Sequence, residues 1–246
     1  MRNIRLTLAY DGAAYHGWQR QPGQPTVQGA IEACLQQLTQ QPCRLRGASR
    51  TDAGVHALGQ VASFRSETTL SCAALARGLN ALLPPDIVVR HAEDVDLTFD
   101  PRRDCAGKHY RYALHNARTL QAPLTGHAWQ LRGPLDVGAM AQAAWSLVGE
   151  HDFAAFRAAD CDRLDTRRTI YRASVARGVG PALLLDLEGT AFLKNMVRII
   201  TGTLVEVGRG RMRPAIIGEL LAHGDRRRAG PTAPAYGLVL VQVHLA

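Results

Sequence analysis

The chain opens with MRNIRLTLAY (residues 1–10), in which polar and apolar side chains alternate. The apolar positions are every second residue: Ile4, Leu6, Leu8 and Tyr10. Because successive side chains of a β-strand point to opposite faces, this period of two predicts a strand with one buried face. The elements that follow this strand decide the fold.

The segments after the first strand switch between helical and strand patterns. Thr26 is placed to cap a helix, whose apolar positions recur at helical spacing from Val27 to Leu38. Short strands are expected near residues 43–47 and at residues 60–64. Ser71 begins a second helix, and Pro84 stops it before a strand at residues 87–90. This β-α-β-β-α-β order is that of ferredoxin-like, split βαβ domains.

The second half of the chain has a similar mixture of elements. We expect strands at residues 108–114, 169–176, 182–187 and 238–245, and helices at residues 136–148, 192–207 and 214–222. The predicted fold class is α+β, with two ferredoxin-like halves that have mainly antiparallel sheets and helices on one face. Residues 1–104 would form the N-terminal subdomain and residues 105–246 the C-terminal one. The face opposite the helices would stay open for a ligand.

The composition describes a globular protein with an excess of basic residues. Lys plus Arg number 29 against 21 for Asp plus Glu, which gives a net charge of +8 and favours a polyanionic partner such as nucleic acid. Five widely spaced cysteines without a C-x-x-C pair suggest neither a disulfide framework nor a thiolate metal site. The chain shows no signal-peptide pattern and no bilayer-spanning apolar run, so we expect a cytoplasmic protein without a membrane partner.

Several sequence signatures of common enzymes are absent. The chain has no phosphate-binding G-x-x-x-x-G-K-[ST], no H-E-x-x-H and no G-x-G-x-x-G that opens a helix. Its nine histidines are not spaced like metal ligands. We therefore expect no metal and no cofactor, and kinase, NTPase and dehydrogenase activities are disfavoured.

A single carboxylate stands out in GASRTDAGVHALGQVASF (residues 47–64). Asp52 lies two residues after Arg50, between a Gly/Ala-rich loop and an alternating strand. On its own, an Asp before Ala-Gly is typical of a structural turn. Basic clusters interleaved with aromatic residues elsewhere are instead typical of a surface that binds phosphates and stacks bases. These clusters are Arg102-Arg103, Lys108-His109-Arg111, Arg163 with Arg167-Arg168, Arg209-Arg211-Arg213 and Arg226-Arg227-Arg228.

The segment RTDAGVH (residues 50–56) resembles a motif of the tRNA pseudouridine synthases of the TruA type. Four further segments resemble motifs of that family, in the expected order: DGAAYHGWQRQPGQPTVQG, KHYRYALHN, FLKNMVRIITGTLVEVG and RAGPTAPAYGLVL. Together they cover nearly the whole chain. The chain departs from the family pattern at Ser49, where Gly is usual, and at Tyr236 before Gly237; Ser49 bears on the flexibility of the loop that carries Asp52.

The resemblance implies isomerisation of uridine to pseudouridine in tRNA, without a cofactor. The implied targets are positions 38, 39 and 40 in the anticodon stem-loop. The resemblance also implies a homodimer in which one tRNA contacts both subunits, with no protein cofactor. The catalytic and RNA-binding cleft would then lie on the sheet faces that the helices leave open.

Four residues are candidates for the site. Asp52 suits the role of nucleophile, because a carboxylate can add covalently to the base or the sugar and later leave. Arg198, in an apolar helical run, is the candidate partner that aims this carboxylate. The resemblance assigns Tyr110 to stacking against the uracil, and its phenol could help to move the C5 proton. Arg50 is the candidate to clamp the space that a flipped uridine leaves.

Two other functions explain part of this pattern. A non-catalytic RNA-binding module on the same fold accounts for the charge and the aromatic residues, but not for a carboxylate in a basic site. A nucleoside N-glycosidase could use Asp52 to cleave the glycosidic bond. Release of free uracil, against formation of an isomer of equal mass, distinguishes an N-glycosidase from an isomerase.

Overall fold

The computed structural model of the chain describes residues 1–119, 124–161 and 163–246. Within these ranges the fold is a mixed α/β one, with five α-helices and ten strands that pair mostly antiparallel. The chain divides into two compact units. The first unit comprises Met1–Ala106 with Val239–Ala246, and the second comprises Gly107–Leu238.

The first unit contains the predicted β-α-β-β-α-β order. Its elements are β1 (Arg2–Tyr10), α1 (Val27–Thr39), β2 (Arg46–Gly47), β3 (His56–Ser66), α2 (Cys72–Leu82), β4 (Ile87–Val95) and most of β10 (Leu238–Leu245). β1 pairs antiparallel with both β3 and β4. β2 pairs with β3 at Arg46–Gly47, and β10 runs parallel to the start of β3.

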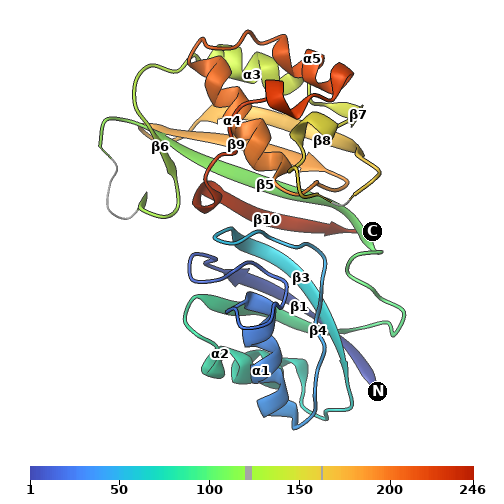
Figure 1. The fold of residues 1–246 in the computed structure, drawn as a ribbon. Helices are drawn as coiled ribbons and strands as arrows, with labels where there is room; N and C mark the ends of the chain where they lie inside the picture. Colours follow the sequence, from blue (N-terminus) through green and yellow to red (C-terminus); the bar gives the residue numbers. More distant parts are fainter. Residues whose placement is uncertain (120–123, 162) are drawn as a thin grey trace. The chain divides into compact units, whose positions relative to one another are not determined.

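The alternating pattern of β1 is confirmed by burial. Ile4, Leu6 and Leu8 are completely buried, whereas Arg5 and Thr7 on the other face are half-buried. α2 packs on β4 and α1 packs beside α2, below the strands in Figure 1. Both predicted helix caps are present. The Thr26 hydroxyl accepts a hydrogen bond from the Gly29 amide, and the Ser71 hydroxyl accepts one from the Ala74 amide.

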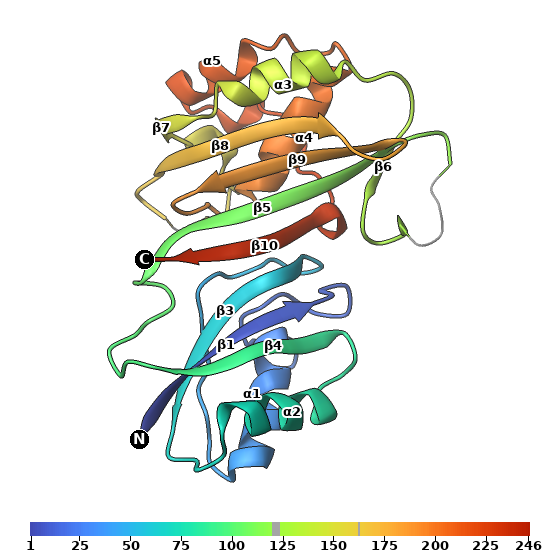
Figure 2. The ribbon, with the colours of Figure 1, turned by 180° about the vertical axis from the view of Figure 1, so that it is seen from behind.

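The second unit has its helices above its strands in Figure 1. Its elements are β5 (Cys105–Asn116, from Gly107 on), β6 (Trp129–Leu131), α3 (Val137–Trp145), β7 (Gly149–Asp152), β8 (Arg167–Arg177), β9 (Ala182–Gly189), α4 (Met196–Gly208) and α5 (Ile216–His223). The strand order is β5-β9-β8-β7, and β6 runs parallel to the end of β5. Figure 2 looks onto the strands of this unit with α4 behind them, so none of the helices in the described ranges covers the face of β8 and β9 toward the viewer.

The predicted elements are all present, with some different bounds. β8 and β9, at the two strands predicted for residues 169–176 and 182–187, pair as an antiparallel hairpin, and the last strand occupies the predicted residues 238–245. The long helix was predicted from residue 192 but begins at Met196. The reason is Asn195, which has a left-handed backbone (φ 61°, ψ 5°) that cannot continue a right-handed helix.

Long-range pairing decides the grouping of the two units. Because β10 pairs with the start of β3, residues 239–246 belong to the first unit although they end the chain. This grouping of the C-terminal strand follows from pairing between strands and not from sequence order. Within the described ranges, none of the helices has the length and apolar character needed to cross a membrane.

Candidate active site

Asp52 lies in a tight turn between β2 and β3. The Val55 amide donates a hydrogen bond to the Asp52 carbonyl (3.2 Å), and Gly54 between them has a φ of 76°, which favours glycine. Thr51 and Val55, on either side of the turn, are 6% and 2% exposed, whereas Asp52 itself is half-buried. The turn is therefore fixed at both ends and presents one carboxylate between them.

Gln60 of β3 holds the chain that leads into this turn. Its side chain is completely buried and pairs with the backbone of Ser49: Nε2 donates to the Ser49 carbonyl (2.8 Å), and Oε1 accepts from the Ser49 amide (3.2 Å). Nε2 also lies 3.5 Å from the Tyr10 hydroxyl, which is 2.8 Å from the Thr51 hydroxyl. One buried network thus fixes residues 49 and 51, just before Asp52.

The loop after β1 supports the turn from another side. The Trp18 amide donates to the Thr51 carbonyl (3.0 Å), and the Gly54 amide donates to the Tyr15 carbonyl (3.3 Å). The Trp18 ring is 1% exposed and lies so close to Gly47 that a Cβ there would be 2.5 Å from the indole nitrogen. The glycine at residue 47 is therefore required by the packing of Trp18.

Tyr15 anchors the same loop to the start of β4. Its hydroxyl donates to Asp86 Oδ1 (2.7 Å), and the Asp11 amide donates to the Asp86 carbonyl (2.9 Å). Burial, together with the hydrogen bond to the Asp86 carboxylate, raises the pKa of Tyr15 far above its usual value. The phenol therefore stays protonated and continues to donate this bond.

Arg50 is exposed, although the residues on both sides of it are buried. Its long side chain can therefore reach outward from a rigid backbone two residues before Asp52. A second arginine, Arg102, donates from Nε to the Gly47 carbonyl (3.1 Å) and so adds positive charge beside the same loop. Residues 47–55 thus combine one carboxylate with neighbouring guanidinium groups.

Two further residues of the first unit could help to hold a metal ion. His56 Nδ1 lies 2.9 Å from Asp11 Oδ1 and 3.1 Å from the Gly12 amide. If Nδ1 accepts the hydrogen bond from this amide, it cannot also donate to Asp11, so one of the two contacts depends on the tautomer.

Arg198 lies in the first turn of α4, in the second unit. Its guanidinium is fixed by two hydrogen bonds: Nε donates to the Ala233 carbonyl and Nη1 to Asn195 Oδ1, both at 2.8 Å. Asn195 has a left-handed backbone and directly precedes the helix, and its side-chain oxygen accepts the hydrogen bond from Arg198. These two bonds orient the plane of the guanidinium.

Residues 230–234 form a strap along α4. The Gly230 amide donates to the Thr203 hydroxyl (2.9 Å), and the Ala233 amide donates to the Arg198 carbonyl (3.1 Å). A Cβ at Gly202 would lie 1.8 Å from the Pro231 carbonyl oxygen, so the strap can approach the helix only because residue 202 is glycine. The strap thereby supplies the Ala233 carbonyl that holds Arg198.

Tyr110 of β5 is buried, with 6% of its surface exposed. Its ring packs edge-on against Phe192, with ring centroids 5.1 Å apart and an interplanar angle of 80°. Tyr112, two residues on, is completely buried, and its hydroxyl donates to the Pro234 carbonyl of the strap (2.7 Å). Burial and the nearby Tyr236 raise the pKa of Tyr112, whereas the positive charge of Arg198 lowers it. The side chains of Tyr112, Tyr236 and Arg198 are therefore close enough to interact electrostatically.

The four predicted site residues therefore fall into two groups. Asp52 and Arg50 share one turn of the first unit, and Tyr110 and Arg198 belong to the second unit. The sequence alone did not identify Gln60 or residues 230–234 as supports of the site. A polar Gln60 within the otherwise buried run of β3 was a usable signal, because a buried amide must find hydrogen-bond partners. The strap has no such local signal.

Comparison with known proteins identifies the family. The model of a family described as tRNA pseudouridine synthase matches residues 7–102 and 143–244. The chain is 50% identical over 244 residues to the tRNA pseudouridine synthase A of Geotalea daltonii, and this match covers 99% of both chains. It is also 50% identical over 243 residues to the protein of the same name from Myxococcus xanthus, with 99% of this chain and 92% of that one covered. Because these matches span most of the sequence, the chain belongs to the tRNA pseudouridine synthase family.

Proposed function

We propose that this enzyme modifies uridines at positions 38, 39 and 40 in the anticodon stem-loop of tRNA, with Asp52 as its nucleophile. Isomerisation of uridine in tRNA follows from the family itself. The observation that supports Asp52 is its turn: one half-buried carboxylate stands between buried residues that Gln60, Tyr10 and Trp18 hold in place. A nucleophile needs such a fixed position, because misplacement of a reacting group is costly in rate.

The reaction requires one group that forms a covalent bond with the substrate and is later released. In the reaction the C1′–N1 bond breaks, the uracil turns while it is held, and C5 bonds to C1′; C5 loses a proton and N1 gains one, so the product is an isomer. The Asp52 carboxylate adds covalently to the base or the sugar and is released intact. The balance requires no oxidant and no second substrate. The target nucleotide must first leave its stack to reach the turn.

The remaining site residues have supporting roles in this proposal. Arg198 pairs with the Asp52 carboxylate and aims it, a role supported by a guanidinium plane that Ala233 and Asn195 already hold. Tyr110 stacks on the uracil, and its position beside Phe192 supports an aromatic contact surface. Arg50 clamps the space that the flipped nucleotide leaves, supported by its exposure next to Asp52.

We also infer the finer features of fold and assembly. The element order of the first unit, with β1 between β4 and β3, supports a ferredoxin-like half. The division into subdomains 1–104 and 105–246, the catalytic and RNA-binding cleft, the homodimer and the cytoplasmic location remain proposals that rest on the sequence and its resemblance. Each is independent of the role of Asp52.

The nucleophile is tested with Asp52→Asn on tRNA that carries 5-tritiated uridine. Tritium release reports loss of the C5 proton, and we expect single-turnover release to fall by more than about a thousandfold, as for other nucleophile removals. Binding of tRNA should remain, because a carboxylate in a basic loop does not attract phosphate. Asp94→Asn makes the same charge change at an exposed site of the first unit and should leave release unchanged.

The target positions are tested on tRNA in which cytidine replaces uridine at positions 38, 39 and 40. The wild-type enzyme should release no tritium from this tRNA. Rapid turnover by Asp52→Asn would contradict the role of Asp52 as nucleophile. Tritium release from the substituted tRNA would contradict only the proposed target positions 38, 39 and 40.

A further inference from the structure

Most arginines of the second unit that the sequence groups into clusters already have carboxylate partners. Ion pairs with acids of the same unit occupy eight of them: Arg111 with Asp186, Arg167 with Glu150, Arg168 with Asp165, Arg209 and Arg211 with Glu206, Arg213 and Arg228 with Glu219, and Arg227 with Asp225. Arg172, outside the clusters, pairs with Glu188. A paired guanidinium has its charge compensated and gains less from an approaching phosphate. The clusters are therefore not equivalent as RNA contacts.

The arginines of the second unit that differ from this majority include Arg163 and a group of three. Arg118, Arg132 and Arg177 are exposed, and their side chains make no ion pair and no hydrogen bond with any residue that the structure describes. The sequence around these three supplies no local carboxylate. Residues 105–135 contain no Asp or Glu, and neither do residues 166–185. Local carboxylates are thus excluded from two long segments.

The fold brings these two acid-free segments to one end of the sheet. Asn116 at the end of β5 pairs with Leu131 of β6, and Arg132 follows directly. The Gln130 side chain donates to the Arg118 carbonyl (2.8 Å), which ties the chain after β5 to β6. The Asn116 amide also donates to the carbonyl of Pro181 (2.8 Å), in the turn of the β8–β9 hairpin.

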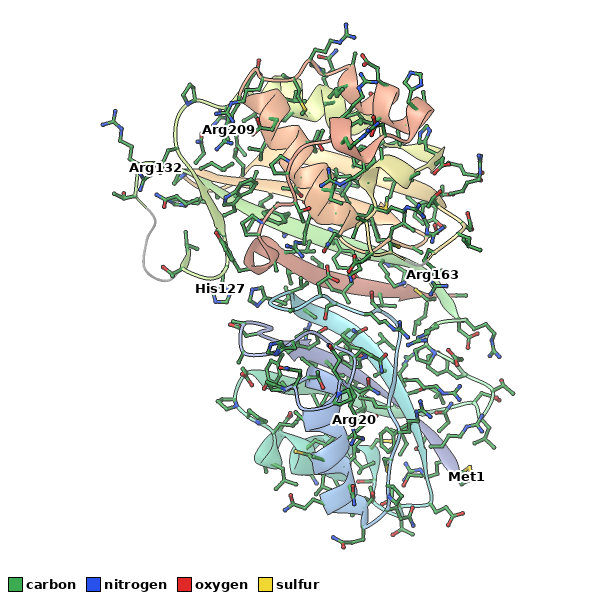
Figure 3. The ribbon with its side chains drawn as sticks, in the orientation of Figure 1. Met1, Arg20, His127, Arg132, Arg163 and Arg209 are labelled. Carbon is green, nitrogen blue, oxygen red and sulfur yellow. The ribbon has the colours of Figure 1, made fainter. Side chains whose placement is uncertain are left out.

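Arg177 completes this group. It is the last residue of β8 and pairs with Leu183, just beyond the same hairpin turn. The ends of β5, β6 and β8 therefore lie together, and they carry at or next to them three arginines that have no carboxylate partner among the described residues, here called the arginine end (Arg118, Arg132 and Arg177). Figure 3 shows Arg132 at the outer edge of the second unit, beside the end of β6 that Figure 1 labels.

We infer that the arginine end, whose residues take no part in holding Asp52, binds backbone phosphates of the tRNA substrate. The guanidinium fork matches phosphate oxygens and binds them in bidentate fashion. Three exposed, uncompensated forks without a neighbouring acid fit a polyanion, and the family membership supplies one, because the substrate is tRNA. The inference rests on that substrate but not on the role of any catalytic residue.

The test compares two triple variants that lose the same charge. Arg118→Gln, Arg132→Gln and Arg177→Gln together remove the arginine end. Arg167→Gln, Arg172→Gln and Arg227→Gln together remove three exposed arginines that are ion-paired. The affinity for tRNA is measured over a series of salt concentrations. Each phosphate contact contributes roughly 0.7–0.9 to the slope of log K against log salt. The first triple variant should therefore lose about two to three units of slope, and the control triple much less.

Two further measurements complete the experiment. Single-turnover tritium release at saturating tRNA should stay at the wild-type rate in the first triple variant, because Asp52 and its supports are untouched. The corresponding triple Arg→Lys variant keeps the charges and should keep most of the slope. Equal loss of slope in the two Gln variants would overturn the inference, since binding would then follow net charge alone. An unchanged slope in the first variant would overturn it as well. If Asp52→Asn enzyme is inactive but binds tRNA with the wild-type slope of log K against log salt, the inference about the arginine end still holds.

Discussion

At the scale of single residues, the position of Asp52 depends on buried neighbours in the sheet of the first unit. Gln60 and Tyr10 are core residues of β3 and β1, yet their polar atoms hold Ser49 and Thr51. A buried amide that loses its partners is costly, so this network has one arrangement that satisfies its members. Gln60 and Tyr10 thus tie the residues just before Asp52 to the sheet, and this fixes the position of the carboxylate.

Gln60→Met tests this positioning role. Methionine keeps the volume but leaves the Ser49 amide and carbonyl without their partners, so the turn should shift. A displacement of about 1 Å can cost about a hundredfold in rate, and we expect kcat to fall by tens to a hundredfold with little change in KM.

The control for Gln60→Met is Asn3→Leu. Asn3 is equally buried and donates to the carbonyls of Asp96 and Phe99, near the other end of β1. Both variants should lower the melting temperature, but only Gln60→Met should lower the rate per folded molecule. Parallel loss of stability with unchanged kcat in both would show that Gln60 is merely structural.

Arg198→Lys and Arg198→Met test the second candidate. Lysine keeps a positive charge but has no planar guanidinium. It therefore cannot donate to the Ala233 carbonyl and Asn195 Oδ1 and at the same time present further N–H groups to the Asp52 carboxylate. Methionine keeps part of the packing and removes the charge. We expect kcat to fall in both variants, and further for methionine, while the melting temperature changes little. If methionine lowers stability but leaves single-turnover release intact, Arg198 has no part in the reaction.

At the scale of elements, α4 and the strap of residues 230–234 work as one structure. The strap carries the carbonyls that accept from Arg198 and Tyr112, and it reaches the helix at Gly202. Close approach of two backbones requires a residue without a Cβ at the contact. The place of Arg198 therefore depends on a segment far along the chain.

Gly202→Ala should push the strap away from α4. The added Cβ would lie 1.8 Å from the Pro231 carbonyl oxygen, which is backbone and can move only with the strap. We expect a lower melting temperature and a lower kcat, because Ala233 moves with Pro231. Gly218→Ala in α5 is the matched control, since a Cβ there meets no atom within 4 Å. It should be neutral or stabilise by up to about 1 kcal/mol, because alanine is the better helix former. Equal effects of the two changes would contradict this account.

At the scale of the whole molecule, charge pairing links the stability of the second unit to pH. Asp186 is 6% exposed and lies 2.6 Å from His109 Nε2 and 2.9 Å from Arg111 Nε. Burial by itself raises the pKa of Asp186, but the hydrogen bonds from Arg111 and His109 outweigh it and hold the pKa below its ordinary value. A carboxyl with a depressed folded-state pKa stabilises the fold above its unfolded pKa, and this stabilisation is lost as pH falls through the folded value.

We therefore expect the free energy of unfolding to fall below about pH 4, near the unfolded pKa of an aspartate. Asp186→Asn should be less stable than the wild type at neutral pH, and the two should converge in acid. Denaturant unfolding at a series of pH values measures this. Glu150→Gln removes an exposed pair with Arg167 and should change stability little. A constant difference between Asp186→Asn and the wild type at all pH values would contradict the role of Asp186.

The sequence by itself determined those features that depend on neighbours along the chain. The alternation of β1, the caps at Thr26 and Ser71 and the bounds of the last strand were all predicted correctly, because periodicity and capping are local. The segments that resemble motifs of the family indicated the family, and the comparisons confirmed it. The roles of Asp52, Tyr110, Arg198 and Arg50 stay predictions.

Only the tertiary structure decided which distant segments meet. No local pattern indicates that β10 pairs with β3, that Gln60 holds Ser49, or that residues 230–234 run along α4. The same holds for the arginines, which look alike in sequence but differ in whether a carboxylate from another strand reaches them. The physical reason is that hydrogen bonds and ion pairs act over a few ångströms in space, whatever the separation along the chain.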